Sequence, residues 1–296
     1  HGTREEELVQ SGPLIQTGTG KSGRSLESLA FAKECADECA KYTDLLEASP
    51  LLGKAQRPVQ SLLRDLDAQA ALPILLSAYV CLDADRFAEV ARWVLVFVMR
   101  YSVMANQDSS GLENVLFQLA RRIRTDSVTP DGKPEPSKFG KCVGAVRQTL
   151  EQASPTLERV LAVDDLILSP DEARYVVDRV ARFMQTKTKE IAIGDVNIEH
   201  VFPKRPSVEW TNAKELEPML WHLGNLTALG TRINQKTGNN GFAVKRTHYA
   251  QKTELDMPQE IARDFTDWTP ATIRDRARRL ASVMVKVWSF ENTSFV

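Results

Sequence analysis

The chain has 296 residues, 43% hydrophobic and 26% charged, a composition typical of a soluble globular protein with one large or two ordinary domains. Its formal net charge of -1 excludes nucleic-acid binding through a field spread over the whole molecule, so any such site has to be a local patch. The longest dense apolar run, WVLVFVM at residues 93–99, is too short to span a bilayer, and no secretory signal pattern is present. We therefore expect a cytoplasmic protein with no membrane partner.

The N-terminal part of the chain is predicted to be a helical bundle. Residues 1–25 are rich in Gly, Ser and Thr, as expected for a linker or a frayed end. From residue 26 to residue 187, apolar residues recur at helical spacing. Helices are predicted at residues 26–48, 59–80, 83–104, 112–125, 137–153 and 169–187. Pro73 breaks or kinks the second helix, while Ser169 and Pro170 fit the N-cap and first position of the last.

The four cysteines do not indicate a metal centre. Cys35 and Cys39 lie four residues apart in the first predicted helix, but no second pair with zinc-ligand spacing accompanies them. We therefore expect these thiols to be reduced, as in a cytosolic protein.

The pattern changes near residue 188, and residues 188–296 are predicted to form a second domain with α and β elements. Residues 191–203, IAIGDVNIEHVFP, predict a strand, and LGNLTALGTRI at 223–233 predicts a second strand or a turn pair. A loop with a short helix separates them, and the helical segment at 233–252 is broken between Gly238 and Gly241. The last element is a helix that starts at Thr269-Pro270 and has one apolar face: Ile273, Ala277, Leu280, Met284 and Val287. The fold class expected is therefore mainly α with a small α+β part.

The order strand, loop, strand, helix, with a His at the end of the first strand and an Asn in the helix, is that of ββα-metal (HNH, or His-Me finger) nucleases. Phosphodiester hydrolysis needs a base that activates water, and imidazole suits this near neutral pH. It also needs a hard divalent cation, Mg²⁺ or Mn²⁺, with oxygen ligands. We predict His200 as the base, with Glu199 and Asn234 as metal ligands. Adjacent strand residues point to opposite faces, so Glu199 and His200 both contribute only if the strand twists or ends there.

Four segments carry a resemblance to a known family: IEHVFP at 198–203, Trp210, LGNLTAL at 223–229, and INQKTGN at 233–239 with Gly241, Phe242 and Lys245 after it. They resemble the C-terminal HNH-type domain of the GmrSD and SspE group of modification-dependent restriction endonucleases, which includes phosphorothioate-sensing defence proteins. The resemblance covers residues 174–290 and is gapless from Gly224 to Lys245. It implies a catalytic set of His200, Asn225 and Asn234, with Glu199 as the acidic neighbour. Asn225 would orient the loop through backbone hydrogen bonds. Supporting roles would fall to Asn239, Phe242, Lys245 and Tyr249.

The chain departs from the family pattern in two places. Asn240-Gly241 stand where the family often has Lys-Pro, which alters only a loop. No DGQQR-type motif for nucleotide hydrolysis is present, and the first residue is His1 rather than Met. We therefore expect this chain to be the effector half of a larger NTPase-nuclease protein. Its missing N-terminal domain would carry nucleotide hydrolysis and sensing of the modification.

Basic residues without acidic neighbours predict where DNA phosphates bind. Between residues 231 and 252 there are five cations and no acid: Arg232, Lys236, Lys245, Arg246 and Lys252. The arginines of the last helix, at 274, 276, 278 and 279, fit either a second DNA surface or a solvated face. His222 and His248 are expected to be structural or surface residues.

The function that follows is a divalent-metal-dependent endonuclease that nicks double-stranded DNA in anti-phage restriction. Double-strand cleavage by one such site needs a homo-oligomer or repeated nicking. The alternative is a catalytically degenerate HNH fold that binds DNA or a partner domain. A further interpretation, compatible with the nuclease, is that the helical half is a scaffold that couples an N-terminal sensor to this domain.

Overall fold

The computed structural model describes residues 21–185 and 196–292, which fall into two compact units. The smaller unit ends at Thr43, and its described part is the greater portion of helix α1 (Lys21–Glu47). Side chains from Ser28 to Thr43 are almost all exposed, including Cys35 and Cys39, which are free thiols. Most of the predicted linker at 1–25 lies outside the described residues, but residues 21–25 form the first turns of α1 rather than a linker.

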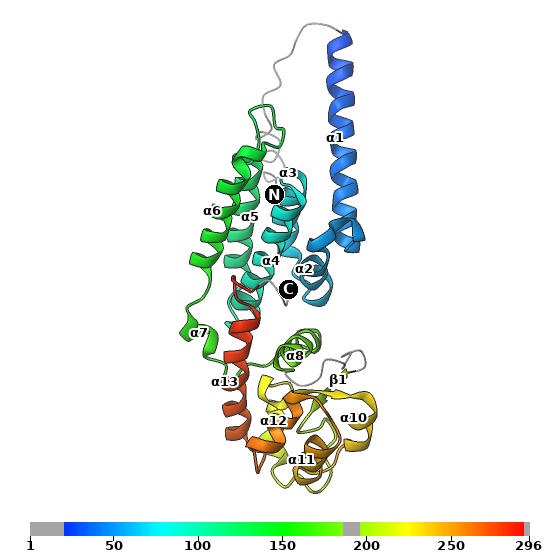
Figure 1. The fold of residues 1–296 in the computed structure, drawn as a ribbon, viewed down its shortest axis with the longest axis vertical. Coiled ribbons are helices and arrows are strands. Elements are labelled where there is room, and N and C mark those ends of the chain that lie inside the picture. The colour runs from blue at the N-terminus through cyan, green and yellow to red at the C-terminus, as the bar shows by residue number, and fades with distance from the viewer. Residues whose placement is uncertain (1–20, 186–195, 293–296) are drawn as a thin grey trace, which may run out of the picture. The chain divides into compact units, whose positions relative to one another are not determined.

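The larger unit begins at Asp44, and its first half is the predicted helical bundle. Its α-helices are α2 (Gln56–Gln60), α3 (Leu72–Cys81), α4 (Ala84–Val98), α5 (Ser109–Asp126), α6 (Pro136–Ala153), α7 (Leu157–Leu161) and α8 (Pro170–Met184). The 3₁₀ turns are η1 (Pro50–Ala55) and η3 (Gln69–Ala71), and the π-helical turns are η2 (Ser61–Asp65) and η4 (Met99–Met104). Because residues 93–98 are apolar on all sides, α4 is buried, with α3, α5 and α6 packed near it (Figure 1).

Two predicted features of this half are confirmed. Pro73 separates two elements and lies in the first turn of α3, where its missing N–H removes no helical hydrogen bond. Ser169 caps α8: its Oγ accepts from Glu172 N at 3.3 Å, and Ser169 N donates to the Glu172 carboxylate at 2.8 Å. This capping box fixes where α8 begins, next to the C-terminal half of the chain.

The C-terminal half contains a two-stranded antiparallel sheet of β1 (Val196–His200) and β2 (Leu226–Gly230), in which His200 is paired with Leu226. Around it lie α9 (Ala213–Leu216), η5 (Glu217–Met219), η6 (Leu223–Asn225), α10 (Thr231–Thr237), α11 (Phe242–Gln251), α12 (Asp256–Asp264) and α13 (Pro270–Val287). Strands at β1 and β2, the helix break before α11 and the final helix α13 are as predicted. Helix α12 was not predicted. The predicted domain boundary at 187/188 and strand residues 191–195 lie outside the described residues.

The two faces of the sheet join different cores. Ile198 and Ala228 pack into the large core that includes α8 and the bundle, whereas Leu229 packs into a smaller core with Trp210 and Trp268. This follows from the two-residue period of a strand. Ile198 and His200 of β1 therefore face α8, and Glu199 faces α11 on the other side.

Helix α13 is bonded to both halves of the larger unit. Its apolar face is buried, as predicted, and Trp288 follows it into the core. At this end Arg100 Nε donates to Trp288 O at 2.8 Å, and Arg92 donates to Phe290 O at 2.9 Å. Across the described ranges, no helix combines the length and apolar character that a membrane span requires.

Candidate active site

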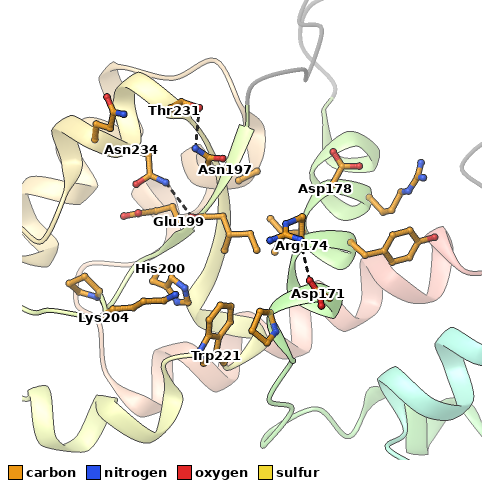
Figure 2. Close-up of a pocket in the computed structure, with 18 of the residues that line it drawn as sticks. Asp171, Arg174, Asp178, Asn197, Glu199, His200, Lys204, Trp221, Thr231 and Asn234 are labelled. Carbon is orange, nitrogen blue, oxygen red and sulfur yellow. Dashed lines mark hydrogen bonds and ion pairs between the residues drawn. The ribbon is translucent and has the colours of Figure 1, made fainter. Parts of the chain in front are cut away.

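A cleft of about 980 Å³ runs between the sheet and α8. The sheet side contributes Glu199 and His200 from β1, Asn234 from α10, and Lys204 and Trp221 from loops (Figure 2). The opposite wall comes mainly from α8, whose Asp171, Arg174, Tyr175, Asp178 and Arg179 line it. Residues of a predicted active site therefore converge on one cleft, and the bundle-side helix α8 closes it.

His200 has the geometry of a general base. Its Nδ1 lies 2.9 Å from Leu220 O, and because a carbonyl only accepts, Nδ1 carries the proton. Nε2 then keeps its lone pair, and no hydrogen-bond partner for it is found among residues 21–185 and 196–292. Burial lowers the pKa of His200 from 6.5 to about 4, and the positive charges of Lys204 and Lys245 add to this. The imidazole is therefore neutral near pH 7, the form that accepts a proton.

Asn225 holds the loops that carry this histidine. Its Oδ1 accepts from Phe202 N at 2.8 Å and from Trp268 Nε1 at 3.0 Å. Its Nδ2 donates to Phe202 O at 3.1 Å and to Leu220 O at 3.0 Å, the same carbonyl that His200 bonds. Asn225 is 0% exposed and does not line the cleft. It orients the loop as predicted, but it is a positioning residue and not a group that meets substrate.

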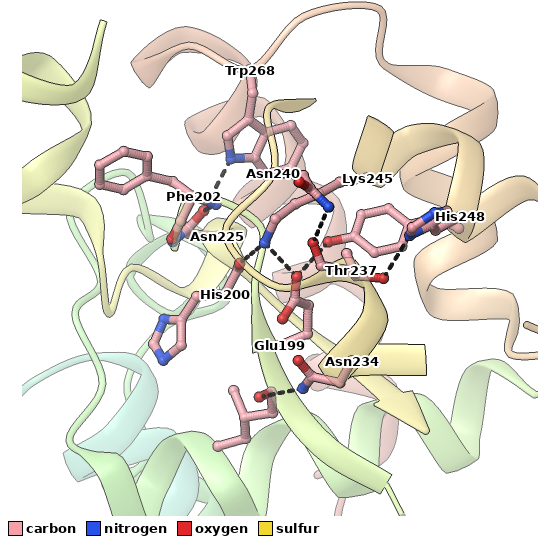
Figure 3. A network of polar contacts seen from close by, with 12 residues as sticks. Glu199, His200, Phe202, Asn225, Asn234, Thr237, Asn240, Lys245, His248 and Trp268 are labelled. Atoms are coloured by element: carbon pink, nitrogen blue, oxygen red, sulfur yellow. Dashed lines mark hydrogen bonds and ion pairs between the residues drawn. The ribbon is translucent and has the colours of Figure 1, made fainter. Parts of the chain in front are cut away.

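Glu199 is buried against α11, on the face opposite to His200. Its Oε1 accepts from Lys245 Nζ at 2.6 Å and from Tyr249 OH at 2.9 Å, and Lys245 also donates to His200 O at 2.9 Å. Burial raises the pKa of the Glu199 carboxyl, although the ion pair with Lys245 opposes this. Figure 3 shows the contact between Glu199 and Lys245. Glu199 and His200 therefore point to opposite faces of β1, as strand alternation requires, although Glu199 also contributes to the lining of the cleft.

Asn234 bonds the middle of α10 to β1. Its Nδ2 donates to Ile198 O at 3.2 Å, so its Oδ1 is the atom left for other contacts. Within the described part of the chain, neither Oδ1 of Asn234 nor Oε2 of Glu199 has a hydrogen-bond partner, and both residues line the cleft. One carboxylate oxygen and one amide oxygen fit a hard cation that keeps several waters. Among the described residues, no three His, Cys, Asp or Glu side chains come together to hold a metal ion, so protein ligands at this point would be the two oxygens alone.

Of the five predicted DNA-binding cations, two are buried or half-buried and three are exposed. Lys245 is wrong as a surface cation, because it is 0% exposed and neutralises Glu199. Arg246 is half-buried and its Nε donates to Ala262 O at 2.9 Å. By contrast Arg232, Lys236 and Lys252 are exposed and remain available to phosphate.

The predicted supporting residues also differ in role. Tyr249 is fully buried and bonds Glu199, and Phe242 stacks on Trp268 with ring centroids 5.1 Å apart. Asn239 is exposed at the edge of the cleft, and its backbone carbonyl accepts from Ser207 N. Of the two histidines expected to be structural, His222 bonds Asp164 O and Gly224 N, while His248 bonds Thr237.

The four arginines of α13 all have acidic partners. Arg274, Arg278 and Arg279 are paired with aspartates. Arg276 is 0% exposed: its Nη1 donates to Gly224 O at 2.8 Å and Leu226 O at 2.7 Å, and its Nε pairs with Glu260 at 3.1 Å. Arg276 therefore bonds the backbone on both sides of Asn225, at Gly224 and at Leu226. Its position i+3 from Ile273 on the apolar face was the available signal for its burial.

Lys204 and Trp221 line the cleft beside His200, although the sequence predicted no site role for Lys204 and favoured a core or domain-joint position for Trp221. Lys204 Nζ lies 4.5 Å from the centre of the Trp221 ring, whose edge meets His200 at a centroid distance of 4.5 Å. The Lys directly after IEHVFP was the only local signal for this arrangement.

Comparison with protein families matches residues 156–283 to the family described as GmrSD restriction endonucleases, C-terminal domain. The comparison with curated proteins gave no match. The matched range starts before α7 and so includes α8, the second wall of the cleft, as well as β1, β2 and most of α13.

Proposed function

We propose that the chain, whose residues 156–283 form a C-terminal domain of the GmrSD restriction-endonuclease type, is a DNA endonuclease that hydrolyses phosphodiester bonds in the cleft beside β1. The observation that carries this is His200, which is neutral, has its proton on Nδ1 bonded to Leu220 O, and has Nε2 free in a cleft. A water next to Nε2 would lose its proton to this atom as it attacks phosphorus.

The proposed cation is Mg²⁺, with Mn²⁺ as a substitute. Asn234 Oδ1 and the second carboxylate oxygen of Glu199 would hold it, and when bound it neutralises charge on the phosphate. Lys245 and Tyr249 keep Glu199 in one orientation through its other oxygen. Asn225 holds Leu220 O and the backbone of Phe202, so that His200 does not rotate away.

We further propose that one such site makes one cut, so the product is a nicked duplex, and that double-strand cleavage needs a homo-oligomer or a second nick. On the resemblance to the family, the target would be modified foreign DNA, of the phosphorothioate-linked kind or another, met in the cytoplasm. An NTPase or sensor domain outside this chain would control cutting.

A plasmid-nicking assay with Mg²⁺ or Mn²⁺ tests the proposal. His200→Ala should lower the rate of conversion of supercoiled to open-circular DNA by about 100-fold to 10,000-fold, because it removes the general base. His248→Ala is the matched control, since His248 lies on α11 outside the cleft and should keep the rate of the wild type.

Equal rates for wild type and His200→Ala would refute the assignment. DNA binding without cleavage under every metal tested would favour the alternative, a degenerate nuclease fold that binds DNA or a partner domain. Chelation of the cation with EDTA should abolish nicking and leave the thermal unfolding midpoint within about 2 °C, because the fold has its own core.

A further inference from the structure

Among the cations that line the cleft, Lys204 is placed differently from the others. Arg174 is paired with Asp171 at 3.1 Å, and Arg64 donates to Leu46 O. Arg179 stacks on the Tyr175 ring at 5.3 Å. Lys204 has no hydrogen bond or ion pair with any residue in the described ranges, and its side chain is exposed.

The acidic side chains around the cleft do not neutralise Lys204 either. Asp171 and Asp178 pair with arginines of their own helix, Arg174 and Arg182. Glu199 is paired with the buried Lys245. The cleft thus has one cation beside His200 whose charge is not matched by a carboxylate in the described structure.

Trp221 holds this cation and the histidine at the same time. The ammonium of Lys204 lies 4.5 Å from the indole centroid, within the range of a cation–π contact. The His200 ring meets the same indole at an interplanar angle of 85°. One rigid aromatic side chain therefore keeps a positive charge and the candidate base together, as Figure 2 shows for the three labelled side chains.

We propose that Lys204, held by Trp221, binds a non-bridging oxygen of the phosphate that His200 acts on, or of the phosphate next to it. This rests on the proposed nuclease function and adds a residue to it. An ammonium that is already oriented loses less side-chain entropy when phosphate binds than a free lysine does. It also takes the role that the sequence suggested for Lys245, which is buried.

The test measures binding in the absence of cutting. His200→Ala is the parent, in EDTA, and the probe is a fluorescent DNA duplex of about 20 base pairs, with anisotropy recorded across a salt series. One lost phosphate contact lowers the slope of log K against log salt by about 0.9. We expect that loss for Lys204→Gln and not for Lys204→Arg.

The control is Lys214→Gln, an exposed lysine on α9 that does not line the cleft and should keep the parent slope. Trp221→Leu should weaken DNA binding less than Lys204→Gln does. Adding Trp221→Leu to Lys204→Gln should weaken binding no further. Because His200 is already absent from the parent, this result cannot come from the base.

An unchanged slope for Lys204→Gln, with normal binding by the parent, overturns the role of Lys204 and leaves the nuclease assignment intact. Loss of nicking by wild-type protein together with loss of DNA binding by the parent overturns both. Equal weakening by Lys204→Gln and Lys214→Gln would mean a diffuse charge effect and would also refute the proposal.

Discussion

The hydrogen bonds of Asn225 can be tested with a change of one atom. In Asn225→Asp, an oxygen replaces the Nδ2 that donates to Phe202 O at 3.1 Å and Leu220 O at 3.0 Å. The oxygen that accepts from Phe202 N and Trp268 Nε1 is kept. Volume and shape barely change, so the effect reports on the two donated bonds and on the charge that the new carboxyl carries when it is ionised.

The magnitude follows from the burial of the site. Asn225 is 0% exposed, so no water replaces the lost donors. Phe202 O loses the donor that Asn225 supplies, at a cost of about 1–3 kcal/mol, whereas Leu220 O still accepts from His200 Nδ1. The cost should be smaller at pH 5 than at pH 7, because burial raises the pKa of the new carboxyl, and a neutral acid donates one hydrogen bond.

Urea unfolding followed by circular dichroism measures this free energy. The control is Asn114→Asp on the exposed side of α5, where we expect a change below about 0.5 kcal/mol. Because Leu220 O also accepts from His200 Nδ1, ¹⁵N NMR of labelled histidine should show part of the Nδ1–H tautomer lost in Asn225→Asp. The reasoning is refuted if the two variants are equally stable and the tautomer is unchanged.

Three further predictions concern the same region. Gly224→Ala should destabilise the protein by about 3 kcal/mol or more, since its Cβ would lie 1.9 Å from Ile273 O of α13. The control is Gly144→Ala in α6, where the added Cβ would have no atom within 4 Å and should stabilise the protein by about 0.5–1 kcal/mol. If urea unfolding shows Gly224→Ala to be more stable than Gly144→Ala, the prediction is wrong. Lys245→Met and Glu199→Gln should each lower the free energy of unfolding by about 3–5 kcal/mol, because each leaves a buried partner unpaired. The double variant should lose less than the sum of the two single losses. Strict additivity would mean that the two side chains are not coupled. His200 has its pKa lowered to about 4, so between pH 6.5 and pH 4 the unfolded chain binds a proton that the folded one does not. The free energy of unfolding should therefore fall as pH falls through this window, by about 2–3 kcal/mol, and an identical pH dependence in His200→Gln would exclude this residue as the cause.

Local sequence rules predicted most elements because their signals are local. The capping pair Ser169 and Glu172 and the position of Pro73 each act within one turn of helix. The apolar period of α13 and the helix break after Thr237 are likewise visible in a short window. The short helix α12 was missed although it is amphipathic, with Met257, Ile261 and Ala262 buried, because nine residues are fewer than the window in which helical periodicity is read.

The candidate site was predicted as a set of residues but not as a set of roles. His200 and Asn234 do line one cleft. Asn225 lies behind it, as its expected loop role required. That Lys245 is a buried partner of Glu199, 46 residues away in sequence, depends on α11 packing behind β1. No charge count along the chain contains that information.

The sequence by itself determined the order of elements, the residue types able to activate water and hold a hard cation, and the family motif that joins them. Only the tertiary structure decided which cations are free, which are buried, and that α8 forms the second wall of the cleft. The physical reason is that secondary structure follows from neighbours along the chain, whereas the charge state and availability of Lys245, Arg276 and Lys204 follow from distant groups brought within a few ångströms.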